Sequence, residues 1–168
     1  METEKHDWTK FTKRIGINAG ISEIYKLIST PDGLESWFLR LAEFTLPGNG
    51  VRTGHSGIQK DDSYRWRWYG YSDETTETGK VLEANGADKI KFTFAGECQV
   101  TIHAYPHKEV TVVEITQENI PTDEKSKINY YLGCSEGWAF YLTNLKSLLE
   151  GGIDLRNRDE TIQGVLNS

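Results

Sequence analysis

The residues of this chain best suited to chemistry are four histidines, two cysteines and one acid inside an apolar segment. His103 and His107 have the i, i+4 spacing of a helical metal pair, but Pro106 lies between them at a predicted turn. A metal site needs three or four converging ligands. We therefore expect surface histidines, no metal site and no cofactor.

Cys98, Cys134 and Glu114 could each be a reactive group or an unreactive structural residue. Cys98 and Cys134 are expected to point inward, one from a strand and one from a helix, as small hydrophobic side chains. Nothing near them in sequence would lower a thiol pKa. Glu114 would be an acid–base candidate if buried, because burial raises its pKa, but its alternation with Val113 and Ile115 favours a solvent-facing position. No hydrolase, nucleotide-binding or zincin motif occurs.

The aromatic residues could either line a ligand cavity or fill the core, and core packing is the default for such rings. Five Trp and eight Tyr are present. The candidates for a cavity lining are Trp37, Trp66, Trp68, Phe92, Phe94, Tyr131, Cys134 and Trp138. Arg65 and Arg67 alternate with the strand tryptophans and are expected on the outer face; if they turned inward, they would anchor a ligand carboxylate.

One long amphipathic helix is predicted over residues 126–150. Its apolar stripe, spaced three and four apart, consists of Ile128, Tyr131, Leu132, Trp138, Ala139, Leu142, Leu145 and Leu149. Thr122 or Asp123 is expected to cap its start, and Gly151 with Gly152 to end it. The small residues at 133–137 leave space beside the helix, either for close packing on a strand or for the wall of a cavity.

The rest of the chain predicts an antiparallel sheet. We expect a strand at 10–18, two short helices at 22–29 (capped by Ser22) and 31–37, and further strands at 38–46, 64–69, 76–84, 88–95, 98–104 and 109–118. Consecutive hairpins make a meander with one apolar face, which only the long helix can cover. The predicted fold is thus α+β, a curved antiparallel sheet around a C-terminal helix. A cavity on the order of 300–1,000 Å³ is expected between them.

Composition limits the partners. The net charge of −6 disfavours nucleic acid and anionic membranes. No stretch approaches the roughly 18 apolar residues of a membrane span, no apolar leader is evident, and two cysteines make no disulfide framework. These features favour a soluble cytoplasmic protein. We expect a polar tail at 1–9, one domain at 10–152 and an extension at 153–168 that lies on the surface or packs on a partner.

Several strings resemble the START-like (SRPBCC, helix-grip) superfamily and, within it, the Hsp90-ATPase-activator-homologue family. The matching strings are ISEIYKLISTPDGLESWF, TGKVLEAN, DKIKFTF, VTVVEITQENIPTDE and GWAFYLTNLKSLLEGGIDLR. The resemblance covers about Lys10 to Arg156, nearly the whole chain, and includes the spacings P-x-x-L-x-x-W (Pro31, Leu34, Trp37) and G-W-x-x-x-L-x-x-L (Gly137, Trp138, Leu142, Leu145) in that order. The resemblance implies a birch-pollen-allergen-like helix-grip fold with a hydrophobic cavity.

Three functional hypotheses follow. The first is non-enzymatic binding of a small hydrophobic or amphipathic molecule in the cavity. The second is a co-chaperone-like interaction module, with Hsp90 as a possible partner and a role in the stress response; a homodimer is also possible. The third is a cyclase- or hydratase-like enzyme that uses the same cavity. We favour the first, since no catalytic residue can be assigned.

Overall fold

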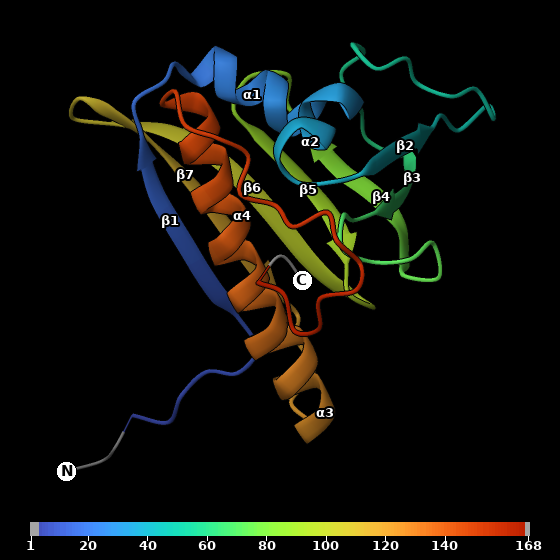
Figure 1. The fold of residues 1–168 in the computed structure, drawn as a ribbon, viewed down its shortest axis with the longest axis vertical. Coiled ribbons are helices and arrows are strands. Elements are labelled where there is room, and N and C mark those ends of the chain that lie inside the picture. The colour runs from blue at the N-terminus through green and yellow to red at the C-terminus, as the bar shows by residue number, and fades with distance from the viewer. Residues whose placement is uncertain (1–3, 167–168) are drawn as a thin grey trace.

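The computed structural model describes residues 4–166 and contains one antiparallel sheet with all helices on its concave side (Figure 1). Residues 1–3 and 167–168, parts of the predicted tail and extension, lie outside the described residues. The seven strands have the spatial order β1-β7-β6-β5-β4-β3-β2. Their bounds are β1 Phe11–Ile17, β2 Leu41–Thr45, β3 Ser63–Arg67, β4 Thr76–Ala84, β5 Lys89–Phe94, β6 Cys98–His107 and β7 Val110–Glu118. The predicted meander and its α+β, helix-grip arrangement are confirmed.

Tight turns between neighbouring strands set the register. At the β4–β5 turn, the side-chain Oδ1 of Asn85 accepts hydrogen bonds from the backbone N–H groups of Ala87, Asp88 and Lys89, each at 3.0 Å. Gly86 has φ +74°, a conformation that glycine adopts without steric cost. Such turns hold consecutive strands antiparallel and keep alternate side chains on the concave face.

The predicted turn at Pro106 is wrong, because β6 continues as far as His107. The turn lies at Lys108 and Glu109 instead, where Lys108 has φ +53°. Pro106 pairs with Thr111 near the end of the ladder, a place where a missing N–H is tolerated.

Two short helices support one end of the sheet, α1 (Ile21–Ser29) and α2 (Pro31–Trp37). Thr30 caps α2, since its Oγ1 accepts from the Gly33 N–H at 3.0 Å. A Cβ at Gly33 would lie 2.3 Å from the Lys26 carbonyl oxygen, so only glycine allows the two helices to pack this closely. The predicted Ser22 cap is wrong, because α1 begins at Ile21 after Gly20, with no side-chain cap.

The predicted long C-terminal helix is confirmed, and it crosses the concave face of the sheet (Figure 1). It consists of α3 (Glu124–Ser126), a π-helical segment η1 (Lys127–Gly133) and α4 (Cys134–Leu149). Asp123 caps the start, where its side chain accepts from the Ser126 N–H at 3.0 Å. Gly151, with φ +83°, ends the helix.

The predicted apolar stripe is wrong in the first half of this helix. Ile128 and Leu132 are 60% and 52% exposed, and Ala139 is exposed too. The π-helical turn holds an extra residue, which rotates later side chains by about 100° relative to a regular α-helix. A stripe extended from α4 at α-helical spacing therefore includes Ile128 and Leu132, although no residue of η1 is buried.

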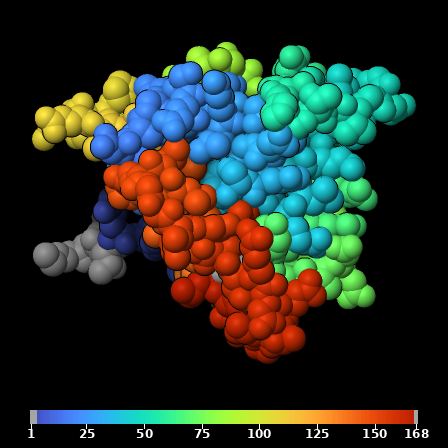
Figure 2. All heavy atoms as spheres, turned by 45° about the horizontal axis from the view of Figure 1, so that its top comes forward, coloured from blue at the N-terminus to red at the C-terminus, as the bar shows by residue number. Residues whose placement is uncertain are grey.

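Both terminal segments contact the long helix. His6 Nε2 lies 2.8 Å from the hydroxyl of Tyr131, and the Trp8 ring packs 5.0 Å from the same ring. After Gly152 the chain runs back along α4 and beside α2 (Figures 1 and 2). No helix among residues 4–166 has the length and apolar character needed to cross a membrane.

Candidate functional site

A cavity of about 100 Å³ lies between the concave face of the sheet and the η1–α4 junction. It is lined by Phe38, Trp68, Phe94, Asn129, Gly133, Cys134, Gly137, Trp138 and Tyr141. Three of the small residues at 133–137, namely Gly133, Cys134 and Gly137, thus form its helical wall. The expected volume of several hundred Å³ is wrong, because the rings of Phe38, Trp138 and Tyr141 occupy most of the space under the helix.

Trp138 anchors the helical side of the cavity. The residue is 2% exposed, and its indole Nε1–H donates to the Gln117 Oε1 at 3.0 Å. The Gln117 Nε2 donates in turn to the Tyr130 carbonyl oxygen at 3.2 Å. Gln117 therefore fixes both the Trp138 ring and the π-helical backbone that borders the cavity. Sequence analysis missed this residue, although its alternation with Ile115 places it on the inner face.

Four of the eight predicted lining residues border the cavity: Trp68, Phe94, Cys134 and Trp138. The other four lie elsewhere. Trp37, Trp66 and Phe92 are packed in the core, and the Tyr131 ring lies with Phe11, Trp8 and His6 on the far side of η1. Gly133 and Gly137 belong to the small residues that the sequence offered as a cavity wall, whereas Phe38, Asn129 and Tyr141 were not proposed.

The two core tryptophans on neighbouring elements differ in their polar contacts. Trp37 donates its Nε1–H to the Leu27 carbonyl oxygen at 2.9 Å. The Nε1 of Trp66 is the only buried side-chain nitrogen or oxygen among the described residues without a hydrogen-bond partner. Its ring stacks on Tyr64 with 3.8 Å between ring centroids, so packing holds it in place.

Both thiols lie on the inner side of the sheet beside Gln117 and remain protonated. Burial raises the pKa of Cys98, and it raises the pKa of Cys134 to about 11. The Cys134 Sγ–H donates to the Asn129 carbonyl oxygen at 3.7 Å. These cysteines therefore act as small wall residues and not as nucleophiles.

One acid on the inner face of the sheet is Glu77, which sequence analysis did not identify. The β3–β4 register pairs it with Trp66, whose side chain is buried, so Glu77 lies on the same inner face. Its Oε1 accepts from the Ala95 N–H at 3.0 Å. Burial raises the pKa of Glu77, and the Ala95 hydrogen bond opposes only part of that effect.

The acid that the sequence did identify points away from the cavity. Glu114 forms an ion pair with Arg14 and accepts from the Tyr105 hydroxyl at 3.1 Å on the outer face of the sheet. Burial raises the pKa of Glu114, but these two partners outweigh that effect and lower it. The solvent-facing interpretation is confirmed.

The arginines of β3 lie on the outer face, as expected, and form ion pairs there. Arg65 bonds Glu43 and Arg67 bonds Asp73, each at 3.2 Å. His103 lies in a strand, 3.6 Å from Asp88. Within residues 4–166, no group of three or more His, Cys, Asp or Glu side chains could hold a metal ion.

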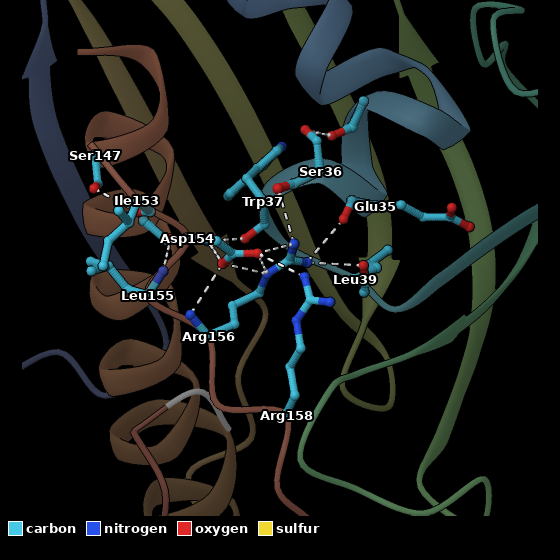
Figure 3. A network of polar contacts seen from close by, with 12 residues as sticks. Glu35, Ser36, Trp37, Leu39, Ser147, Ile153, Asp154, Leu155, Arg156 and Arg158 are labelled. Atoms are coloured by element: carbon cyan, nitrogen blue, oxygen red, sulfur yellow. Dashed lines mark hydrogen bonds and ion pairs between the residues drawn. The ribbon is translucent and has the colours of Figure 1, made fainter. Parts of the chain in front are cut away.

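A network around Arg156 joins the end of the chain to α2 and α4 (Figure 3). The Arg156 guanidinium donates to the carbonyl oxygens of Glu35, Ser36 and Leu39, each at 3.0 Å, and pairs with Asp154 at 2.8 Å. From α4, Asn144 Nδ2 donates to the Trp37 carbonyl oxygen at 2.8 Å, and its Oδ1 accepts from the Leu155 N–H at 2.7 Å. This network fixes α2 and Phe38, which closes one side of the cavity.

The curved antiparallel sheet and the long helix that crosses it define a helix-grip protein. The family model "Activator of Hsp90 ATPase homolog 1-like protein" matches residues 18–150, and the chain belongs to this family. No curated protein matches the sequence.

Solved structures share the fold at low sequence identity. Protein SSP2350 from Staphylococcus saprophyticus is 17% identical, with a TM-score of 0.67 over 88% of this chain and 96% of that one. The Aha1 dimer from Colwellia psychrerythraea is 20% identical, with a TM-score of 0.63 over 85% and 97%. DynU16, a putative protein in the dynemicin biosynthetic locus, is 14% identical, with a TM-score of 0.60 over 88% and 51%.

Proposed function

We propose that this protein binds a small molecule by enclosing one compact group of it in the cavity between sheet and helix. The observation that supports the proposal is the aromatic lining, which leaves about 100 Å³ open below a π-helical segment. Irregular π-helical turns often occur at functional sites. An engineered apolar cavity of about 150 Å³ binds benzene, so a space of this size accepts a group slightly smaller than a benzene ring.

The volume of the cavity limits the size of the ligand group that can bind inside it. A whole lipid or polyketide does not fit this space, so the remainder of the ligand would extend past the rim at Asn129 and Trp68, which are exposed and half-buried. Of the residues first proposed, Trp68, Phe94, Cys134 and Trp138 would contact the enclosed group. Trp37, Trp66 and Phe92 would support the wall from the core.

Tryptophan fluorescence provides the test, because Trp68 and Trp138 border the cavity. Titration with small apolar alcohols should give a saturable change in the wild-type protein. The variant Cys134→Phe places a ring in the cavity and should weaken binding at least about tenfold. The control Ala139→Phe adds the same ring at an exposed site of the same helix and should bind as wild type. Equal loss in both variants, or no saturable change in the wild type, would reject the proposal.

A second candidate function is interaction with an Hsp90-type chaperone, which the family match favours. The described chain also exposes Ile128 and Leu132 on η1, an apolar pair that a partner protein or a second copy of this chain could cover. The test is an ATPase assay of the host Hsp90 with and without the protein, using Ile128→Gln as the variant. Unchanged ATPase activity would exclude this function. Cytoplasmic location and a homodimer stay predictions.

A further inference from the structure

The side chains that line the cavity differ in type from those in the rest of the core. Most buried positions along the sheet hold Ile, Val or Phe, whereas no Leu, Ile or Val lines the cavity. Its apolar walls consist of five aromatic rings, two glycines and a cysteine. A pocket that served only to exclude water could be built from aliphatic side chains, which have no electrostatic preference for their contents. Aromatic rings do have one, since each face carries a negative potential.

Four of the rings form a closed circuit of contacts. The distances between ring centroids are 5.9 Å for Phe38 to Trp68, 6.3 Å for Trp68 to Phe94, 5.3 Å for Phe94 to Trp138 and 4.9 Å for Trp138 to Phe38. Tyr141 packs 5.0 Å from Phe38 as a fifth ring. All five rings border the cavity, and a cation is attracted to an aromatic ring when it lies within about 6 Å of the ring centroid.

The charge near the cavity is negative, as the binding of a cation requires. None of the described residues that line the cavity is a lysine or an arginine. Glu77 lies on the inner face beside the Trp66 and Phe94 strands, held by its 3.0 Å bond from the Ala95 N–H. Ala95, which donates that bond, directly follows the lining residue Phe94 in the chain, so the carboxylate lies next to the cavity wall. A cation in the cavity would offset the cost of this partly buried carboxylate.

We infer that the cavity recognises a methylated ammonium group, held by the rings of Phe38, Trp68, Phe94 and Trp138 with Glu77 as the nearby counter-charge. This inference rests on the proposed function and names the ligand class for the same cavity. A trimethylammonium group has the compact, nearly spherical shape that the space accepts. Asn129, exposed at the rim, can bond a hydroxyl or carbonyl that follows the ammonium group.

The test compares choline with 3,3-dimethylbutan-1-ol, in which carbon replaces the charged nitrogen and the shape is kept. Both are titrated into the full chain at constant ionic strength and followed by calorimetry and tryptophan fluorescence. Choline should bind about tenfold or more tightly, with tetramethylammonium as a competitor. Equal or tighter binding of the neutral alcohol would overturn this inference and leave the apolar cavity as the proposed site. Absence of saturable binding by either compound would overturn both.

Two matched variants test the role of the carboxylate. Glu77→Gln removes the inward charge and should weaken choline binding several-fold, while binding of the neutral alcohol stays unchanged. Glu83→Gln removes the same charge from the same strand, where Glu83 pairs with Lys89 at 3.0 Å, and should leave both affinities unchanged. Thermal melts of both variants verify folding. Wild-type choline affinity in Glu77→Gln, or equal weakening in both variants, would overturn the assignment of Glu77.

Discussion

Replacement of Arg156 by Ala tests whether the segment after Gly152 holds the cavity wall in place. The Arg156 side chain is 3% exposed, and its guanidinium satisfies three carbonyl oxygens of the α2 region as well as Asp154. Removing it takes this donor from three carbonyl oxygens and leaves Asp154 with the weaker side-chain contacts from Asn144 at 3.2 Å and Arg158 at 3.4 Å. Breaking a buried ion pair in this way costs about 3–5 kcal/mol. Because Asp154 stays partly open to water, we expect a loss of about 3 kcal/mol in the free energy of unfolding.

Two further variants separate the effects of charge and geometry. Arg156→Lys keeps the positive charge but lacks the planar fork that reaches three carbonyl oxygens, so it should recover only part of the stability. Arg158→Ala is the matched control, because Arg158 meets the same Asp154 at 3.4 Å with a side chain that is 62% exposed. Such a surface pair contributes about 0–1 kcal/mol.

Urea unfolding followed by circular dichroism measures all three variants, with m-values compared to verify a shared unfolding transition. The account predicts a large loss for Arg156→Ala, a smaller loss for Arg156→Lys and almost none for Arg158→Ala. A loss below about 1 kcal/mol for Arg156→Ala, or equal losses for the two alanine variants, would refute the reasoning. The segment after Gly152 would then contribute little to the stability of the domain.

Three further predictions concern pH and packing. Burial raises the pKa of Asp154, but Arg156 outweighs this effect and lowers the pKa to about 2. The ion pair therefore stabilises the fold at pH values above the ordinary Asp pKa near 4. Acid titration should show a loss of about 1 kcal/mol in the free energy of unfolding as the pH falls from about 4 to 2, and this loss should be absent in Asp154→Asn. Trp138→Ala should cost about 3–5 kcal/mol in urea unfolding, since the ring is buried and hydrogen-bonded. A cost below about 1 kcal/mol would show that neither the packing of the ring nor its bond to Gln117 stabilises the fold. Leu132→Gln should change stability by less than about 0.5 kcal/mol, whereas Leu142→Gln should cost more than about 2 kcal/mol; similar losses would contradict the π-helical register.

The strands and the long helix could be predicted from sequence because each has a local signal. The alternation in 109–118, the Asn85-Gly86 turn and the Gly151 stop depend on neighbours along the chain. The π-helical turn could not be predicted in this way. It is stabilised by tertiary contacts, such as the bond from Gln117 Nε2 to the Tyr130 carbonyl oxygen, and no local spacing reveals it. The exposed positions of Ile128 and Leu132 follow from it.

Only part of the candidate site could be predicted, because tertiary packing also decides which aromatic rings line the cavity. Trp68 and Trp138 were identified by residue type, and this also selected Trp37 and Trp66, which packing places in the core. Residue type alone does not distinguish a ring that borders a space from one that fills it. Glu77 was missed because its inward position depends on the β3–β4 register, whereas Glu114 attracted notice only because its sequence neighbours are apolar.

The most direct test of ligand binding in the cavity is ¹⁵N NMR of the tryptophan indole N–H groups during titration with choline and its neutral isostere. The account predicts that the signals of Trp68 and Trp138 move in a saturable way. The Trp37 indole, bonded to the Leu27 carbonyl in the core, should stay in place. Shifts confined to Trp8 on the outer surface, or an unchanged spectrum at saturating ligand, would contradict the claim that this cavity accepts a ligand.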